Sequence, residues 1–371
     1  MIGVADGIDG VVQRLVPHVD RLRRRTVHRR RLARALDPVP AILAGLPADR
    51  VGDPGGWVLS RRLWSATGIA IAVAGPANED ARVVVKIASD DHAAAALASS
   101  RMRLERLAGD ERLSDWSALL PRVLDHGRVD DAEYLVETAM PGVPAQRLLR
   151  HPAARARLLP AAAASIAQLH RRTRAPHLVD ERSLTEWVDG PVDSLVASVG
   201  PSALEPDAVD LLERLRKALR SRLAGRRVYV GWIHGDYWPG NLLASADGAT
   251  VTGIVDWDQA DPAGLPTHDA LHLVLYSRRL LAQREFGDVV VGFLGGDPLD
   301  HIERASLDIA LDPTDPEELR LGAILAWLRH VATFAPVPGH GTSRRWVRRN
   351  IVTVLRAVDG PMAGAGEGRW L

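Results

Sequence analysis

Short runs of hydrophobic residues, alternating with polar ones, predict β-strands in the first third of the chain. The runs Ile69–Val73 and Arg82–Ile87 are β-branched or alternate with a period of two. A helical pattern follows over Ala93–Leu107, and Tyr134–Val136 predicts one more strand before the turn sequence Met140–Gly142. We therefore expect residues 51–140 to form one unit around a small sheet.

Beyond that turn, the apolar residues recur at helical spacing. The clearest case is Ala154–Thr173, and strands are predicted only at Val228–Ile233 and Val251–Val255. With 371 residues, the chain exceeds the roughly 250–300 at which one hydrophobic core stops growing. Residues 141–371 are therefore expected to form a second, mainly helical unit.

Residues 1–50 are distinguished by charge and are predicted to be a basic extension. Eight arginines lie between Arg21 and Arg34, with leucine and valine between them, which is typical of a basic amphipathic helix. Two interpretations stay open for this helix. It contacts an anionic membrane or polyphosphate surface, or its leucines pack on the body of the protein while its arginines face solvent.

Composition excludes several classes of function. The chain has no cysteine, so it has neither disulfides nor thiolate metal sites, which suits a reducing compartment. The net charge of +1 gives no reason to expect a nucleic-acid partner. No apolar run reaches the roughly 18 residues needed to span a bilayer, and the first ten residues lack the blocks of a signal peptide. We expect a cytoplasmic protein.

The densest cluster of chemically active side chains follows the strand at Val228–Ile233. Asp236 and Asn241 lie in this polar segment, and Asp256 ends the next predicted strand. Oxygen ligands of this kind suit Mg²⁺, which proteins hold with one or two carboxylates together with substrate phosphates. Phosphoryl transfer requires such metal ligands and an acid that accepts the proton of the acceptor hydroxyl. Asp236 is the expected base, and Asn241 and Asp256 are the expected metal ligands.

The two motifs, His-Gly-Asp with Asn five residues after the Asp, then Ile-Val-Asp-Trp, resemble those of the aminoglycoside phosphotransferase-like family, which includes choline, homoserine and sugar kinases. The resemblance implies an α+β, protein-kinase-like fold with a small antiparallel sheet lobe and a larger helical lobe. It also implies ATP, Mg²⁺ and a small-molecule hydroxyl acceptor. His234, Asp236 and Asn241 match the catalytic loop, and Asp256 matches the metal-binding aspartate. We expect His234 to hold the backbone of this loop.

Lys86 is the candidate phosphate-binding residue. It is one of only two lysines, and period two places it opposite Val83, Val85 and Ile87 on its strand. The resemblance assigns it to the nucleotide phosphates, and a solvent-facing lysine on an edge strand is the alternative. Glu105 is the expected ion-pair partner. Glu111 is a competing partner, and an exposed, unpaired Glu105 is a further possibility.

Two other segments are expected to contact the nucleotide. The loop Ser65-Ala66-Thr67-Gly68 holds a single glycine and is either the phosphate-covering loop, through Ser65, Thr67 and Gly68, or a plain hairpin turn. The resemblance also makes Glu137-Thr138-Ala139-Met140 the linker whose backbone, at Glu137 and Ala139, meets adenine.

The remaining candidates leave alternatives open. His268 and His272, four residues apart on a predicted helix, are compatible with a zinc site. Alternatively, Asp269 supports the catalytic loop or caps that helix. Asp258 is placed to influence the metal, or is a solvated loop acid.

The acceptor is not fixed by these motifs. Acidic residues would suit a cationic acceptor, basic residues would suit an anionic one, and Trp238 is compatible with stacking on a sugar ring. The acidic set is Glu181, Glu186, Asp189 and Asp193, and the basic set is Arg344, Arg345, Arg348 and Arg349. A nucleotide-binding pseudokinase is the alternative to an enzyme.

Overall fold

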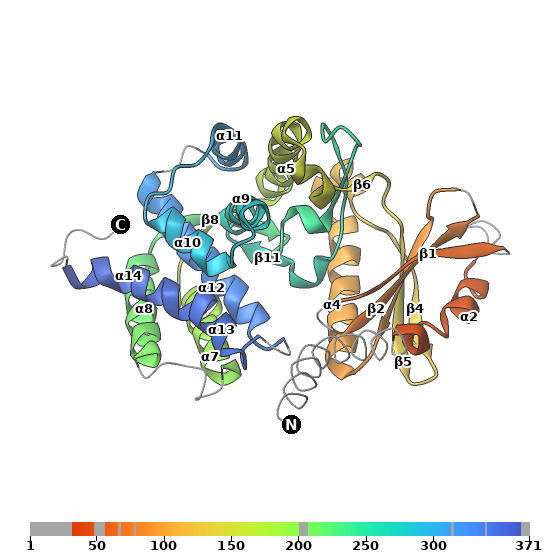
Figure 1. Ribbon diagram of the computed structural model, residues 1–371, viewed down its shortest axis with the longest axis horizontal. Coiled ribbons are helices and arrows are strands. Elements are labelled where there is room, and N and C mark those ends of the chain that lie inside the picture. The colour runs from red at the N-terminus through yellow and green to blue at the C-terminus, as the bar shows by residue number, and fades with distance from the viewer. Residues whose placement is uncertain are drawn as a thin grey trace, which may run out of the picture. The chain divides into compact units, whose positions relative to one another are not determined.

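The computed structural model describes residues 32–47, 56–65, 68–77, 79–199, 207–312, 315–337 and 340–364. They form two compact units (Figure 1). The first contains the described residues up to Arg101 together with Arg122–Ala139. The second contains Met102–Pro121 and the chain from Met140 onward. The segment 102–121, placed by the sequence with the sheet, thus belongs to the helical unit.

The first unit is built on a five-stranded antiparallel sheet with the order β1-β2-β3-β5-β4. The strands are β1 (Trp57–Trp64), β2 (Ile69–Pro76), β3 (Val83–Ala88), β4 (Val123–Val129) and β5 (Ala132–Thr138). The strands expected at Ile69–Val73, Arg82–Ile87 and Tyr134–Val136 are confirmed as the three central ones. Their β-branched and alternating residues are buried on both faces, which is why they gave the clearest pattern.

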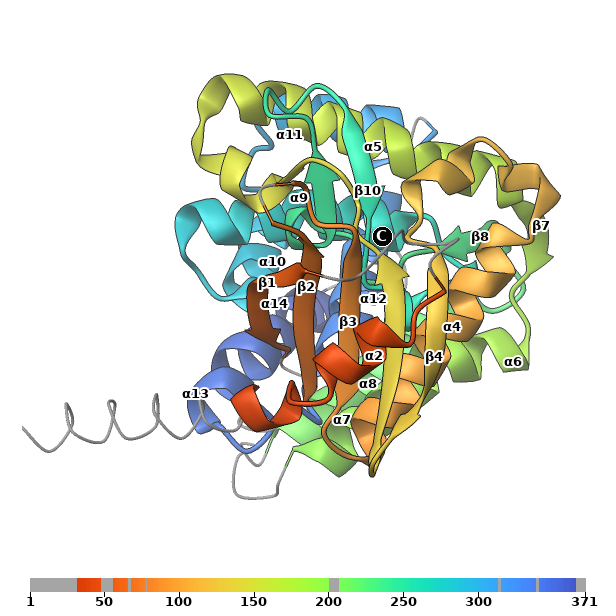
Figure 2. The same ribbon diagram turned by 90° about the vertical axis from the view of Figure 1, so that its right-hand side faces the viewer.

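Each face of this sheet is covered by a helix. On one face, α2 (Val39–Ala44) contributes Val39, Ile42 and Leu43 to a core with alternate residues of β2 and β3 (Figure 2). On the other face, Ala93 and Leu97 from the first half of α4 (Asp91–Ala108) pack on β2, β3 and β5. Residues 32–47, predicted within a basic extension, therefore belong to the core of the first unit. The arginines from Arg21 to Arg31 lie outside the described residues.

The second unit is mainly helical. Its longer helices are α5 (Pro152–Thr173), α7 (Gly190–Ser198), α8 (Ala208–Leu223), α9 (Thr267–Ala282), α10 (Phe286–Leu294), α11 (His301–Ala310), α12 (Pro316–Phe334) and α14 (Thr353–Gly364). Short helices are α6 (Glu181–Leu184) and α13 (Arg344–Val347). The α+β architecture, with an antiparallel sheet unit and a mainly helical unit, is confirmed.

Two small antiparallel sheets carry the loops of the second unit. One has the order β10-β9-β6 and the other the order β11-β8-β7. Their strands are β6 (Val143–Pro144), β7 (Ala175–Leu178), β8 (Arg227–Ile233), β9 (Leu242–Ala244), β10 (Val251–Ile254) and β11 (Asp261–Gly264). The predicted strands Val228–Ile233 and Val251–Val255 are confirmed as β8 and β10.

Helix α9 lies at the centre of the second unit. It contacts α5, α10, α11 and α12, and most of its side chains from His268 to Leu275 are buried. A helix held on so many sides gives its first turn a fixed position, and that turn carries Asp269. Among the described helices, none combines the length and apolar character needed to cross a bilayer.

Candidate active site

The polar loop after β8 turns sharply at Gly235. Its φ of 80° lies in the left-handed region, and a Cβ there would come within 2.2 Å of the Gln259 carbonyl oxygen. Only glycine fits a backbone that is both left-handed and this close to another segment. The turn brings Asp236 out of the strand direction, and the buried Tyr237 hydroxyl fixes the loop by donating to Ala162 O at 2.9 Å.

Asp269 fixes the start of this loop from α9. Its carboxylate is fully buried and accepts from His234 N at 2.7 Å, Gly235 N at 2.9 Å and His170 Nε2 at 3.0 Å. Burial alone would raise the pKa of Asp269, but the hydrogen bond and charge of His170, with the other donors, hold that pKa below its usual range. Asp269 is therefore an ionised carboxylate that organises backbone.

His234 links this loop to the one that carries Asp256. Its Nδ1 accepts from Asp236 N at 3.2 Å and its Nε2 donates to Val255 O at 3.0 Å. The ring is fully buried and lies 4.6 Å from the Trp257 ring, centroid to centroid. Both nitrogens are used by backbone, which is the supporting arrangement expected from the sequence.

Asp236 has a different environment from Asp269. Its Oδ2 accepts from Asn241 Nδ2 at 2.9 Å and from Trp238 Nε1 at 3.1 Å. Burial raises the pKa of Asp236 to about 6. The charge of His234 and the two hydrogen-bond donors act to lower this pKa, and the charge of Asp256 acts to raise it. A carboxyl group with this pKa is largely ionised at neutral pH and still basic enough to accept a proton.

Asn241 and Asp256 supply the oxygen donors expected for a metal. Asn241 uses Nδ2 on the carbonyl and carboxylate of Asp236, so Oδ1 is its atom suited to a cation. Asp256 is exposed and has a left-handed backbone with φ 71° and ψ 63°. Non-glycine residues in this region are strained and concentrate at functional sites. The donor set of carboxylate and amide oxygen fits Mg²⁺.

Asp258 lies two residues after Asp256 in the chain. Its carbonyl oxygen accepts from the guanidinium of Arg103, and its carboxylate accepts from Gln259 Nε2 at 3.1 Å. Burial, followed by the charge of Arg329, lowers the pKa of Arg103 despite the nearby carboxylate of Asp258. The carbonyl of Asp258 thus joins the metal loop to α4 within the second unit.

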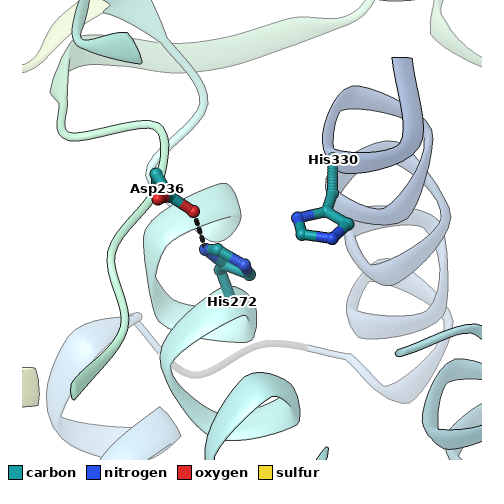
Figure 3. Close-up of side chains that lie close together, drawn as sticks. All are labelled: Asp236, His272 and His330. Carbon is teal, nitrogen blue, oxygen red and sulfur yellow. Dashed lines mark ion pairs between the residues drawn. The ribbon is translucent and has the colours of Figure 1, made fainter. Parts of the chain in front are cut away.

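Two histidines complete the surroundings of Asp236, from α9 and α12. His272 Nδ1 lies 3.6 Å from Asp236 Oδ1, and the rings of His272 and His330 are 5.2 Å apart, centroid to centroid (Figure 3). Burial lowers the pKa of His272 to about 3 and that of His330 well below its usual range. Both rings are neutral. His268, which the sequence makes compatible with a zinc pair with His272, is not in this group.

The first unit holds the nucleotide candidates. Lys86 Nζ lies 3.0 Å from Glu137 Oε2, and both side chains are buried. The register pairs Lys86 with Leu135 and Val84 with Glu137, so the two are diagonal neighbours on one face of the sheet. Glu137, expected only as a linker residue, is thus an ion-pair partner of Lys86. The pairing of Lys86 with Glu105 stays a prediction.

The proposed phosphate loop joins β1 and β2. Across it, Ser65 N donates to Ile69 O at 2.8 Å and Ser65 Oγ accepts from Ile69 N at 2.9 Å. Gly68 has a φ of 84°, while Thr67 lies outside the described residues. Ala139 N donates to Arg82 O at 2.9 Å, so this N–H is already used.

The acidic residues considered for a cationic acceptor are engaged with arginines. Arg220 contacts Glu181 and Asp189, Arg216 lies 2.6 Å from Asp193, and Arg182 lies 2.9 Å from Glu186. The sequence motifs assign no role to His170 or His330, and they make His272 only half of a possible zinc pair. Only the i, i+4 spacing of His268 and His272 gave any signal for them.

Solved structures of known proteins resemble this chain in fold. A search of curated protein sequences found no match. Choline kinase from Cryptosporidium parvum Iowa II shares 11% sequence identity, with a TM-score of 0.52 over 88% of this chain and 95% of that chain. An aminoglycoside phosphotransferase from Streptomyces rimosus, solved with ADP and streptomycin, shares 20% identity, with a TM-score of 0.47 over 79% and 98% of the two chains. The likeness to choline kinase shows the kinase-like fold.

The model of one protein family, described as the phosphotransferase enzyme family, matches residues 74–298. This match covers more than half of the 371 residues and includes Lys86, Asp236, Asn241 and Asp256. The chain therefore belongs to the phosphotransferase enzyme family.

Proposed function

We propose that this phosphotransferase moves the γ-phosphoryl group of ATP to a hydroxyl group of a small molecule. The observation that supports it most directly is the environment of Asp236, whose Oδ2 is held by two donors and whose pKa is near 6. A carboxylate held in one orientation, with a pKa close to neutral, is suited to general-base catalysis.

In the proposed reaction, the acceptor hydroxyl donates a hydrogen bond to Asp236. As its oxygen forms a bond to the γ-phosphorus, the proton passes to the Asp236 carboxylate and the bond from that phosphorus to the bridging oxygen breaks, releasing ADP. Asn241 and Asp256 would hold Mg²⁺, which neutralises charge on the phosphates. Lys86, oriented by Glu137, would bind the nucleotide phosphates as a compact cation.

The acceptor is proposed to be a ring-bearing, carbohydrate-like alcohol rather than a polycation. The rings of Trp238 and Tyr276 are half-buried, and their centroids lie 4.7 Å apart. Trp238 is next to Asp236, because its Nε1 donates a hydrogen bond to the Asp236 carboxylate. Arg279 lies over the Tyr276 ring, 4.7 Å from its centroid. A polycation would need free carboxylates, and the acidic residues on α6 and α7 and between them are already paired with arginines.

The test is phosphate transfer from ATP and Mg²⁺ to a panel of neutral sugars, amino sugars, choline, homoserine and aminoglycosides. We expect transfer to a neutral or amino sugar and a loss on the order of 10²- to 10⁴-fold in Asp236→Asn. Asp308→Asn, at an exposed site on α11, is the matched control. Mg²⁺-dependent ATP binding without transfer to any acceptor would instead support a pseudokinase.

A further inference from the structure

A second set of cation ligands lies beside the proposed Mg²⁺ ligands. Asp236 from the loop after β8, His272 from α9 and His330 from α12 each offer one ligand atom, and these atoms all lie within 4.8 Å of one another. Figure 3 shows the three side chains approaching from three separate elements. One carboxylate and two imidazoles differ in kind from the oxygen donors of Asn241 and Asp256.

The imidazole of His272 packs edge-to-face against the rings of Tyr276 and Phe286. The side chain is 5% exposed, and neither ring nitrogen has a hydrogen bond within the described part of the chain. Buried polar groups are almost always satisfied, and leaving one unsatisfied costs about 1–3 kcal/mol. A bound ion would satisfy a nitrogen of this ring.

The ligand types select a particular class of ion. Imidazole nitrogen favours Zn²⁺ and similar transition metals, whereas Mg²⁺ prefers oxygen. Bonds of about 2.0–2.1 Å at tetrahedral angles separate two ligand atoms by about 3.3 Å. Asp236 Oδ1 and His272 Nδ1, at 3.6 Å, are close to that separation. The ligand nitrogen of His330 lies within 4.8 Å of both.

The charges around the cluster are balanced enough to allow a cation. Asp236 and Asp269 supply negative charge, and Arg279 and Arg329 supply positive charge. Arg329 is occupied elsewhere, donating to Gln259 O at 2.8 Å and lying 3.6 Å from Asp261 Oδ2. Arg279 lies over the Tyr276 ring.

We propose that Asp236, His272 and His330 bind Zn²⁺ or a chemically similar transition-metal ion at a site separate from that of Mg²⁺. The bound ion uses the Asp236 lone pair that would accept the acceptor proton. It therefore inhibits phosphoryl transfer, and this inhibition rests on the proposed function.

The binding test uses Co²⁺, which takes the same ligands as Zn²⁺ and absorbs visible light when nitrogen ligands bind it. The full chain is titrated with Co²⁺ in excess Mg²⁺, which occupies the oxygen ligands. We expect one Co²⁺ per chain, with affinity weakened by roughly 100-fold or more in His330→Gln and in His272→Gln. His340→Gln changes a histidine outside the cluster and should leave the titration unchanged.

Equal Co²⁺ affinity in the wild type, His330→Gln and His272→Gln would overturn the site. So would binding that survives both changes but disappears in Asp256→Asn, because the ion would then occupy the oxygen ligands. The inhibition is tested by the ratio of transfer rates with and without Zn²⁺, which should fall in the wild type and stay near one in His330→Gln. The Co²⁺ titration needs no turnover, so its result stands even if no acceptor is phosphorylated.

Discussion

Asp269 and Asp236 are two carboxylates near the same buried loop, and their surroundings differ in one respect. Asp269 receives three hydrogen bonds distributed over both oxygens, and its pKa is lowered. Asp236 receives its side-chain donors on Oδ2, and its pKa is raised to about 6. Burial alone therefore does not decide the role of an acid. The supply of donors does.

The histidines follow the same rule. Both ring nitrogens of His234 form hydrogen bonds with backbone groups. Its own backbone N–H donates to Asp269. Neither ring nitrogen of His272 has a hydrogen bond within the described residues, and His272 lies beside Asp236. The region around Asp269 and His234 therefore has its polar atoms hydrogen-bonded and fixes the backbone of the loop. The other retains unused lone pairs, which is what proton transfer and metal binding require.

The comparison is tested most severely by Asp269→Asn. Asparagine has one acceptor oxygen and turns an NH₂ group toward donors, so buried N–H groups lose their acceptor. We expect the free energy of unfolding to fall by about 3–5 kcal/mol, measured by denaturant titration.

Asp308→Asn on the exposed face of α11 is the control and should change the free energy of unfolding by no more than about 0.5 kcal/mol. If Asp269→Asn were as stable as that control, Asp269 would not be the structural member of the pair.

The pH dependence of stability should have opposite signs for the two acids. Because the fold raises the pKa of Asp236 from 3.8 to about 6, the folded state favours its protonated form. Wild type should therefore lose about 2 kcal/mol relative to Asp236→Asn as pH rises from about 4 to about 6. The measurement is denaturant unfolding of both proteins across that range without Mg²⁺.

The lowered pKa of Asp269 works the other way, since its stabilising contribution is present above the unfolded-state pKa and is lost as the pH falls through the folded-state value. A wild-type advantage over Asp236→Asn that grew with pH would contradict the raised pKa of Asp236.

Glu137→Gln extends the comparison to the first unit, where a buried acid is matched by a cation. The change preserves shape but removes the charge that faces Lys86, 3.0 Å away. We expect a loss of about 2 kcal/mol in the free energy of unfolding of this unit. Glu133→Gln, at an exposed position on the same strand β5, is the matched control. Equal stability of the two variants would show that Lys86 does not depend on Glu137.

The smallest expected effect is that of Trp238→Phe. It keeps a ring beside Asp236 and removes only the Nε1 donor to Oδ2. Losing one hydrogen bond to a charged group should raise the pKa of Asp236 further and slow transfer at neutral pH about 5- to 10-fold. The readout is the rise of kcat/KM with pH, whose midpoint should move upward. An unmoved midpoint would mean that burial alone sets this pKa.

The sequence predicted what depends on local pattern. The central strands β2, β3 and β5 and the helix α5 follow from periodicity, because their side chains are buried at regular intervals. The catalytic-loop candidates were found because two short motifs hold the residues on either side of β9. Helix α2 was missed because Pro38 and Pro40 interrupt the helical pattern, whereas proline is tolerated at the N-cap and in the first turn, where its missing N–H has no intrahelical partner.

Contacts between distant segments could not be read in the same way. Glu137 meets Lys86 across 51 residues, and His330 approaches Asp236 from a helix almost 100 residues further along the chain. No local rule marks such a residue, because its neighbours are chosen by packing. His170 is likewise an ordinary helix residue in sequence, and only the fold brings it to Asp269 at 3.0 Å.

The left-handed backbone of Asp256 has a consequence for anyone who engineers this chain. Side chains at a φ of 71° cost roughly 1–2 kcal/mol, which glycine avoids. Directed evolution for heat resistance would therefore favour Asp256→Gly, and the selected proteins would be more robust and lack a proposed metal ligand. Thermal stability favours glycine at this position, whereas the proposed metal binding requires aspartate. A library screened only for stability would therefore lose the proposed metal ligand.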